Sequence, residues 1–275
     1  MQAAGSYSMY IKESLMKKSN TGTATSTPAR ALACALMAAM AIVAATPAAA
    51  QAFVDTEAGI AFTGYNDAAI PADMGTRVSL AKDTPAGPVP AFRMRIGYTF
   101  ADRHTVSVLA APLTVKGRGK ADYDISYQDT LFPAGEELTS IYRFDSYRLT
   151  YRWDALKSDR LKLGIGLTGK IRSADIAIAG DSGYANRTDL GVVPLVNFRV
   201  DWNFAGPFSL LVDGDALASP YGRAEDVLAA LTWKKSDSAT LRIGYRVLEG
   251  GSDGGGNVYT FALFHYASAG VTITF

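Results

Sequence analysis

Hydrophobic and polar residues alternate along most of the chain after about residue 53. The clearest run extends from Leu190 to Phe204, where apolar residues occupy every second position and Asn197, Arg199 and Asp201 lie between them. Successive side chains of a β-strand point to opposite faces, so this period predicts strands with one apolar and one polar face. Ten such segments are predicted, at 53–64, 89–100, 104–116, 138–153, 160–179, 188–204, 208–218, 225–235, 239–248 and 258–275.

The connections between these segments alternate in length. Apolar positions change phase between Val108 and Leu113, which a β-bulge or a misplaced boundary would explain, and residues 76–81 form either an extra strand or part of a loop. One end of the molecule therefore has tight turns and the other has longer loops, an asymmetry typical of transmembrane barrels. The short turns are predicted at 101–103, 154–159, 205–207 and 236–238, and the longer connections at 65–88, 117–137, 180–187, 219–224 and 249–257.

Aromatic residues gather on the apolar face just before the short turns. A soluble sandwich has no reason to align its aromatic residues at one level, whereas amphipathic rings settle at the boundary between lipid and water. We therefore predict an aromatic girdle that consists of Tyr98, Phe100, Tyr151, Trp153, Trp202, Phe204 and Trp233.

These patterns favour a membrane barrel over a soluble sandwich. The segments supply the roughly 9–11 residues that a spanning β-strand needs. The predicted fold is all-β, an antiparallel up-and-down transmembrane β-barrel. An even number of strands keeps both ends of the barrel on the short-turn side, and ten strands satisfy this, with eight or twelve as alternatives.

The first 52 residues follow the order of a secretory signal. A positive start at Met16–Lys18 precedes the apolar run Ala31–Ala45 and the small-residue site Ala50–Ala52. The apolar run is shorter than the roughly 20 residues of a spanning helix. We predict cleavage after residue 52, with Met16 as the true start, export to the bacterial outer membrane and a single barrel domain at 53–275.

Composition excludes several functional classes. The formal net charge is +1, with 27 basic and 26 acidic residues, and nucleic-acid-binding domains usually have a strong basic excess. The one cysteine, Cys34, lies within the predicted signal, so neither a disulfide scaffold nor a thiolate metal cluster is expected. We predict no nucleic-acid partner, no cofactor and no metal site.

The polar parity of the strands carries many charges, which a barrel would place in its lumen. Buried charges must be paired or hydrated, so one hypothesis is a paired network that fills a narrow interior, giving the barrel a structural or interaction role. An excess of basic residues suggests instead a narrow anion-preferring, porin-like pore. Lumenal Val193, Leu195, Leu211 and Leu228 suggest a carrier of small hydrophobic molecules. The predicted network consists of Arg93, Arg95, Arg148, Arg152, Lys162, Arg199, Asp201, Asp213, Asp215, Asp226, Arg242 and Arg246, and Glu57, Lys170, Arg172, Asp189 and Lys234 share its parity.

Two local motifs have structural interpretations. Residues Gly164–Gly169 match G-x-G-x-x-G, but a dinucleotide site needs that motif in a turn between strand and helix, and here it lies inside an alternating strand. The small residues would instead make room for large lumenal side chains. Carboxylates at 213, 215, 225 and 226 could bind Ca²⁺, although Arg223 among them favours salt bridges.

The last segment, VYTFALFHYASAGVTITF, resembles the final strand of outer-membrane β-barrel proteins of Gram-negative bacteria. Its Val271, Ile273 and Phe275 resemble the signal that the barrel assembly machinery reads, which implies that machinery and outer-membrane lipids as partners and leaves the oligomeric state open. The segments NDAAIPADMGTRVSL, FRMRIGYTFADRHTVSVLAAPL and GDALASPYGRAEDV resemble a family of uncharacterised small envelope barrels. This resemblance implies location and fold but no activity.

The stretch His265–Gly270 invites comparison with lipid A deacylases, outer-membrane enzymes with a His-x-Ser arrangement on the lipid-facing surface. Here Ala267 occupies the position of the serine, and Ser268 has the opposite parity. A hydroxyl on the other strand face cannot reach the imidazole. A lipid-modifying enzyme stays an alternative function, and no catalytic residue is predicted.

Overall fold

The computed structural model describes residues 51–220, 222–253 and 257–275. The predicted signal peptide lies outside the described residues except for Gln51 and Ala52, which begin the first strand. The strands are β1 (Gln51–Ala69), β2 (Val78–Ser79), β3 (Val89–Phe100), β4 (His104–Ala111), β5 (Thr114–Gly119), β6 (Ile125–Tyr127), β7 (Thr130–Phe132), β8 (Leu138–Lys157), β9 (Leu161–Gly180), β10 (Gly183–Ala205), β11 (Phe208–Ser219), β12 (Gly222–Lys234), β13 (Ala239–Asp253) and β14 (Tyr259–Thr274).

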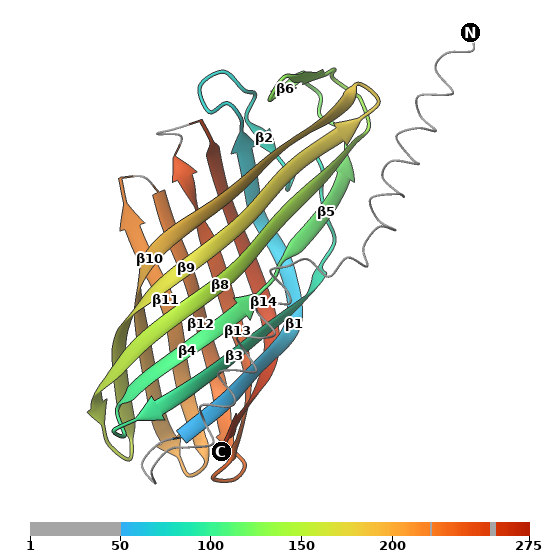
Figure 1. Cartoon of the computed structure of the whole chain (residues 1–275). Coiled ribbons are helices and arrows are strands. Elements are labelled where there is room, and N and C mark those ends of the chain that lie inside the picture. Colours follow the sequence, from blue (N-terminus) through green and yellow to red (C-terminus); the bar gives the residue numbers. More distant parts are fainter. Residues whose placement is uncertain (1–50, 221, 254–256) are drawn as a thin grey trace, which may run out of the picture. The chain divides into compact units, whose positions relative to one another are not determined.

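Ten antiparallel strand positions close into a barrel (Figure 1). They are β1, β3, the pair β4 and β5, and β8 to β14, each hydrogen-bonded to its neighbour in the chain. β14 closes the ring by pairing with β1, from Thr274 opposite Phe53 to Tyr259 opposite Ala69. The predicted all-β, ten-stranded barrel is confirmed. No helix in the described part of the chain has the length and hydropathy that a membrane crossing requires.

The irregular third segment is two strands joined end to end. β4 ends at Ala111 and β5 begins at Thr114, and both pair with β8 along successive stretches. The phase change predicted between Val108 and Leu113 is thus a boundary within one barrel position. The ambiguous stretch 76–81 contains the short strand β2, which pairs with the end of β1.

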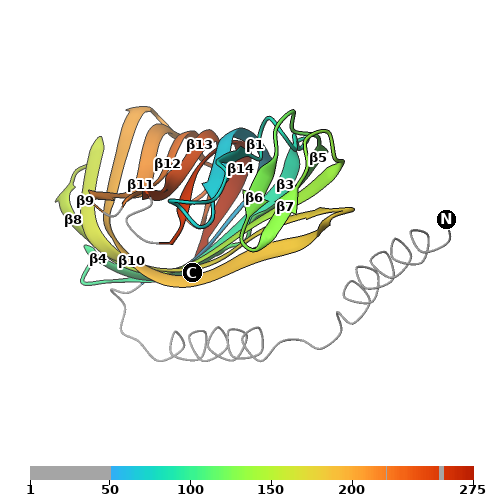
Figure 2. The same ribbon diagram turned by 90° about the horizontal axis from the view of Figure 1, so that it is seen from above.

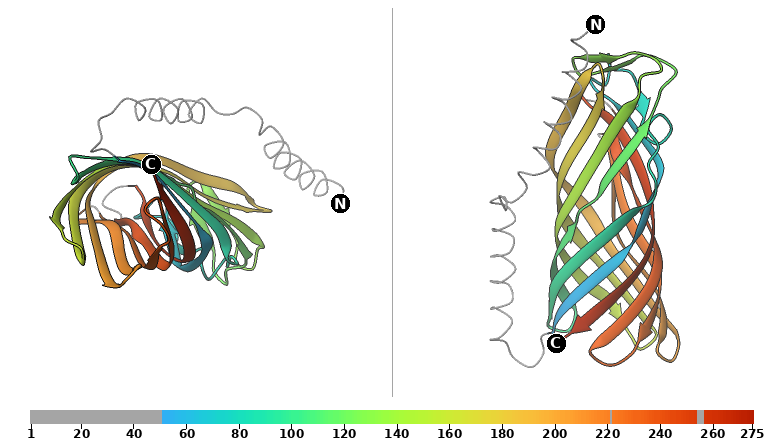
Figure 3. Two further views of the ribbon diagram at one scale, coloured as in Figure 1. Left: turned by 90° about the horizontal axis from the view of Figure 1, so that it is seen from below. Right: turned by 90° about the vertical axis from the view of Figure 1, so that its right-hand side faces the viewer.

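The two ends of the barrel differ less than the sequence suggested. The C-terminal end of β14 lies beside the short turns (Figure 3). Two predicted longer connections, at 180–187 and 219–224, are wrong, because β9 and β10 continue to Gly180 and Gly183, and β11 and β12 to Ser219 and Gly222. Strands that project beyond the apolar belt have water on both faces, so they lose the alternation by which a strand is identified.

Side chains on the outer face form an apolar belt. Ile165, Leu167 and Ile171 on β9 all point outward and are exposed, as are Leu149 and Tyr151 on the adjacent β8. A contiguous exposed apolar surface around a closed barrel is suited to lipid and not to water.

We expect Leu167→Arg to destabilise the barrel in lipid by about 2–4 kcal/mol, the typical cost of an arginine on the lipid face near the bilayer centre. Leu167 is 69% exposed, so its replacement removes no buried packing. The change in stability therefore depends on whether lipid or water surrounds the arginine. Denaturant unfolding in liposomes, followed by tryptophan fluorescence, measures the effect. The matched control is Leu131→Arg, on β7 and 58% exposed, which should be neutral. Equal effects of the two substitutions would contradict a lipid-facing belt at Leu167.

An apolar cap lies at the loop end. The hairpin of β6 and β7 buries Ile125, Tyr127 and Phe132 completely, against Ile176 and Ile178 of β9. The Tyr127 hydroxyl donates a hydrogen bond to the Ile176 carbonyl oxygen at 3.0 Å. Burial raises the pKa of the Tyr127 hydroxyl. The long connection between β5 and β8 is therefore a packed part of the fold.

Candidate functional site in the barrel lumen

A network of ion pairs crosses the lumen. Asp226 on β12 accepts hydrogen bonds from three arginines: Arg93 of β3 at 2.8 Å, Arg246 of β13 at 2.5 Å, and Arg148 of β8. All four side chains are buried. In the order of strands around the barrel, β3 and β8 lie far from β12, so these contacts join opposite walls.

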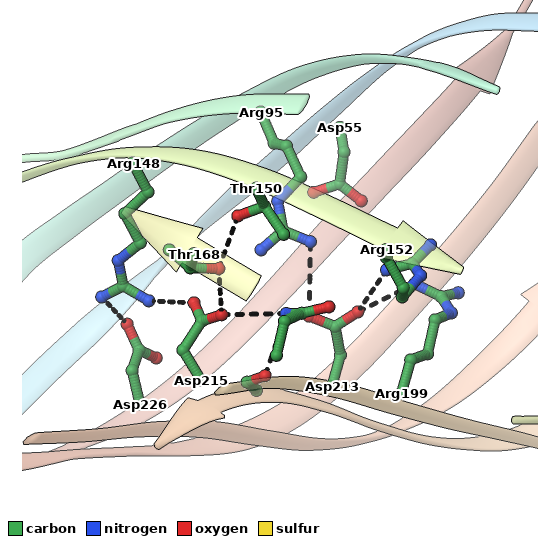
Figure 4. Close-up of polar contacts among 12 residues, drawn as sticks. Asp55, Arg95, Arg148, Thr150, Arg152, Thr168, Arg199, Asp213, Asp215 and Asp226 are labelled. Atoms are coloured by element: carbon green, nitrogen blue, oxygen red, sulfur yellow. Dashed lines mark hydrogen bonds and ion pairs between the residues drawn. The ribbon is translucent and has the colours of Figure 1, made fainter. Parts of the chain in front are cut away.

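Two more aspartates, both on β11, extend the network (Figure 4). Asp213 contacts Arg95 of β3 at 3.3 Å and Arg199 of β10 at 3.0 Å. Asp215 accepts hydrogen bonds from Arg148 at 2.7 Å, and also from Thr168 and Asn197. The predicted charges on these strands are thus brought together, with most of their polar atoms satisfied.

The network reaches the barrel seam through two acids of β1. Arg246 binds Glu57 at 2.8 Å, and Arg242 binds Asp55 at 2.6 Å and Glu57 at 3.2 Å. Asp55 was not among the predicted residues. Its signal was present in the sequence, because it shares the parity of Glu57 on an alternating strand.

Two predictions about charged residues need correction. Lys162 is exposed near the short turns and lies outside the network. Its side chain has the inward parity, but it is at the beginning of β9, beyond the packed part of the lumen. The acidic group near Arg223 does not form one site. Asp226 faces the lumen, whereas Arg223 has the opposite parity on β12 and forms an ion pair with Glu249. No group of three potential metal ligands occurs among the described residues. Arg152 and Asp201 lie at the margin, where Arg152 contacts Asp213 and Asp154, and Asp201 contacts Arg199.

The aromatic residues of the predicted girdle lie on the outer face near the short turns. Phe100, Tyr151, Trp153, Trp202, Phe204 and Trp233 are exposed and Tyr98 is half-buried. The sequence interpretation missed His104, whose ring stacks on Phe100 at 5.4 Å and whose Nδ1 lies 2.8 Å from the Tyr151 hydroxyl. His104 has the outward parity at the start of β4, so the sequence could have predicted its position in the girdle.

At the C-terminal end, Val271 and Ile273 are half-buried on the outward parity and pair with β1 and β13. Phe275 is exposed, and its N–H donates to the Ala52 carbonyl oxygen at 2.9 Å. The predicted assembly signal is therefore accessible from outside the barrel.

The glycine motif and the stretch around His265 lie on the strands where the sequence predicts them. The glycine motif is inside β9, where Gly164 faces Arg152, and a Cβ at Gly164 would come within 2.6 Å of Arg152 Cδ. His265 stacks on Tyr245 on the outer face, with its Nδ1 2.5 Å from the Tyr245 hydroxyl. Ser268 has the inward parity, so this strand places no hydroxyl beside the imidazole.

A pocket of about 690 Å³ occupies the loop half of the lumen, above the ion-pair network. Its apolar part includes Tyr142 and Phe144 of β8 and Leu248 and Phe264 of β13 and β14, and the rings of Tyr142 and Phe264 meet across the lumen at 5.5 Å. The adjacent region, from β9 and β10, is basic and contains Lys170, Arg172 and Arg187 together with Asp189. Its volume is that of typical small-molecule sites.

Several polar groups around the pocket have no partner among the described residues. Lys170 is 3% exposed, and no ion pair or hydrogen bond to it occurs among the described residues; its ammonium lies 4.6 Å from the centre of the Phe144 ring. Arg172 pairs with Asp189, but its buried Nε has no hydrogen-bond partner, and neither has the buried hydroxyl of Thr260. Buried polar groups in proteins are normally satisfied, so this pocket has unmet capacity for a polar ligand.

No protein-family model matches the sequence, and no curated protein does. Among solved structures the chain is similar to the outer membrane protease OmpT from Escherichia coli, with a TM-score of 0.53 and 9% identity over 82% of this chain and 97% of that one. It is also matched to Neisserial surface protein A, with a TM-score of 0.31 and 17% identity over 82% and 97% of the two chains. The first likeness shows the fold, which is that of a Gram-negative outer-membrane β-barrel protein.

Proposed function

We propose that this protein is an outer-membrane barrel with a closed lumen that binds a small amphipathic anion in the pocket at its loop end. The observation that carries this proposal is Lys170, a buried side chain at the pocket that forms no ion pair with an acid of the described residues. Isolated buried charges are costly. The buried charged side chains of the described chain are five cations and four anions, and Lys170 is the cation that those anions leave unpaired.

The chemistry of the two parts of the pocket defines the ligand class. A carboxylate or similar anion would accept charge-assisted hydrogen bonds from Lys170 and from the free Nε of Arg172. Its apolar body would lie against Tyr142, Phe144 and Phe264, whose rings supply large contact areas. Such a division into a few polar groups and an apolar wall is typical of ligand pockets.

The other candidate functions have less support. Ion pairs between opposite walls favour a closed lumen over an anion-preferring pore, because an open path would have to break several buried pairs. For a lipid-modifying enzyme or a protease of the OmpT kind, the chain offers only His104 and His265, and both lie on the outer face among aromatic rings. The likeness to OmpT extends to the fold alone at 9% identity.

We expect Lys170→Met to weaken binding of a dansyl-labelled medium-chain fatty acid by about tenfold to a hundredfold, since a hydrogen bond to a charged group contributes roughly 1.5–3 kcal/mol. Methionine keeps the apolar stem beside Phe144 and removes the charge. Fluorescence titration of the barrel in lipid nanodiscs measures the affinity.

The matched control is Lys162→Met, which removes a lysine of the same strand and parity that is exposed outside the pocket. It should bind like the wild type. An uncharged dansyl alkyl amide should bind the wild type and Lys170→Met equally well. The proposal is wrong if the wild type does not bind the fatty acid, or if Lys170→Met binds it with unchanged affinity.

A further inference from the structure

The barrel wall is incomplete between β10 and β11. β10 pairs with β9 from Gly183 to Trp202, but with β11 only from Val196 to Ala205. Residues 183–195 of β10 thus have no strand on their second side in the described part of the chain. From above, the upper half of β10 runs away from β11, and the side view agrees (Figures 1 and 2).

The unpaired part of β10 lies at the level of the apolar belt. Leu190 and Val192 point outward and are 75% and 76% exposed, continuing the row that runs through Val196 and Val200 to Trp202. At the tip of β10, Gln128 Nε2 donates to the Asn186 carbonyl oxygen at 3.4 Å. Unpaired backbone in lipid is costly and is tolerated where it borders a cavity.

The pocket extends to both edges of this opening. Val192, Val193 and Pro194 of β10 line it, and so does Leu217 of β11. Proline lacks the N–H of a ladder hydrogen bond and is found at strand edges, which is the place that Pro194 occupies. The opening therefore joins the apolar belt outside to the pocket inside.

We infer that this opening is a lateral passage, through which the amphipathic anion moves between the pocket and the outer leaflet of the membrane. The inference rests on the proposed binding function. The basic residues Lys170, Arg172 and Arg187 belong to β9 and β10, next to the opening, so a head group can stay near them while its apolar tail passes between the strands. Apolar residues at both edges of the opening would keep the tail out of contact with water.

Tethering the two edges tests the passage. In a chain with Cys34→Ser, the double variant Val192→Cys and Ala218→Cys places thiols on the outward parity of the two strands, where the two residues would be diagonal neighbours if the register of β10 and β11 continued. A short bismaleimide added after folding then joins them. The control pair, Val200→Cys and Val212→Cys, lies on the same strands where they already pair.

We expect the tether at 192 and 218 to slow uptake of the dansyl fatty acid from preloaded liposomes at least tenfold, with equilibrium affinity unchanged. The control tether should leave uptake at the wild-type rate. Unchanged uptake in the tethered variant, with binding intact, overturns the lateral passage and leaves the pocket. Absence of binding in every variant contradicts the proposed function itself. Intermolecular cross-links in Val192→Cys alone would assign the edge to a second copy of the chain and would also overturn the passage.

Discussion

Asp226→Ala should destabilise the barrel by about 3–5 kcal/mol, the usual cost of removing one partner from a buried ion pair. Asp226 is the common acceptor for Arg93, Arg148 and Arg246. Alanine would leave these three guanidinium groups close together with less compensating charge, so their mutual repulsion and lost hydration would act against the folded state. Denaturant unfolding in liposomes, with tryptophan fluorescence as the signal, measures the change.

The control is Asp237→Ala, which removes an aspartate from an exposed pair with Lys234 at 2.8 Å in a short turn. Exposed pairs contribute little, so no measurable change is expected there. If Asp226→Ala fails to fold, Asp226→Asn keeps the size and one acceptor oxygen and should show a smaller loss. An unfolding midpoint unchanged in both Asp226 variants would refute the role of Asp226 as a hub.

Phe132→Ala should release the cap at the loop end. Phe132 is fully buried among Ile125, Tyr127 and Leu138, and truncation of a buried phenylalanine costs about 3–5 kcal/mol. Because the β6–β7 hairpin forms a small separate sheet, the loss should appear as local opening and not as unfolding of the barrel. Amide hydrogen exchange across Ile125–Phe132 should accelerate by about two orders of magnitude or more.

The neighbouring Leu131 gives a matched control, since it is on the same short strand with its side chain exposed. Leu131→Ala should leave the exchange of the hairpin unchanged. Equal acceleration in both variants, or none in Phe132→Ala, would contradict a cap that depends on buried packing.

Much of the fold follows from local patterns in the sequence. Alternation from Leu190 to Phe204 predicted both the strand and the face that meets lipid, because strand parity needs no knowledge of distant residues. Aromatic residues before the short turns predicted the girdle for the same reason. Strand ends outside the belt could not be predicted this way, as the continued strands at Gly180 and Gly183 show.

The site depends on information that parity does not contain. Arg93 and Asp226 are 133 positions apart, and their contact depends on strand register around the whole barrel. Parity placed Lys170 in the lumen but could not distinguish a paired charge from an unpaired one. Pro194 was the available signal for the unpaired edge, since it interrupts the longest alternating run with a residue that edges favour.

Closure by β1 and β14 determines the order in which the barrel can form. Most other neighbours around the barrel are consecutive along the chain, and the two exceptions, β1 with β3 and the pair β4 and β5 with β8, join stretches much closer in the chain than the seam does. The seam instead joins Phe53 to Thr274, and closing so long a loop is entropically costly and slow. Until the seam forms, the sheet has two free edges that can pair with other chains. Assembly therefore passes through an open, aggregation-prone sheet, and its final step is a single long-range ring closure.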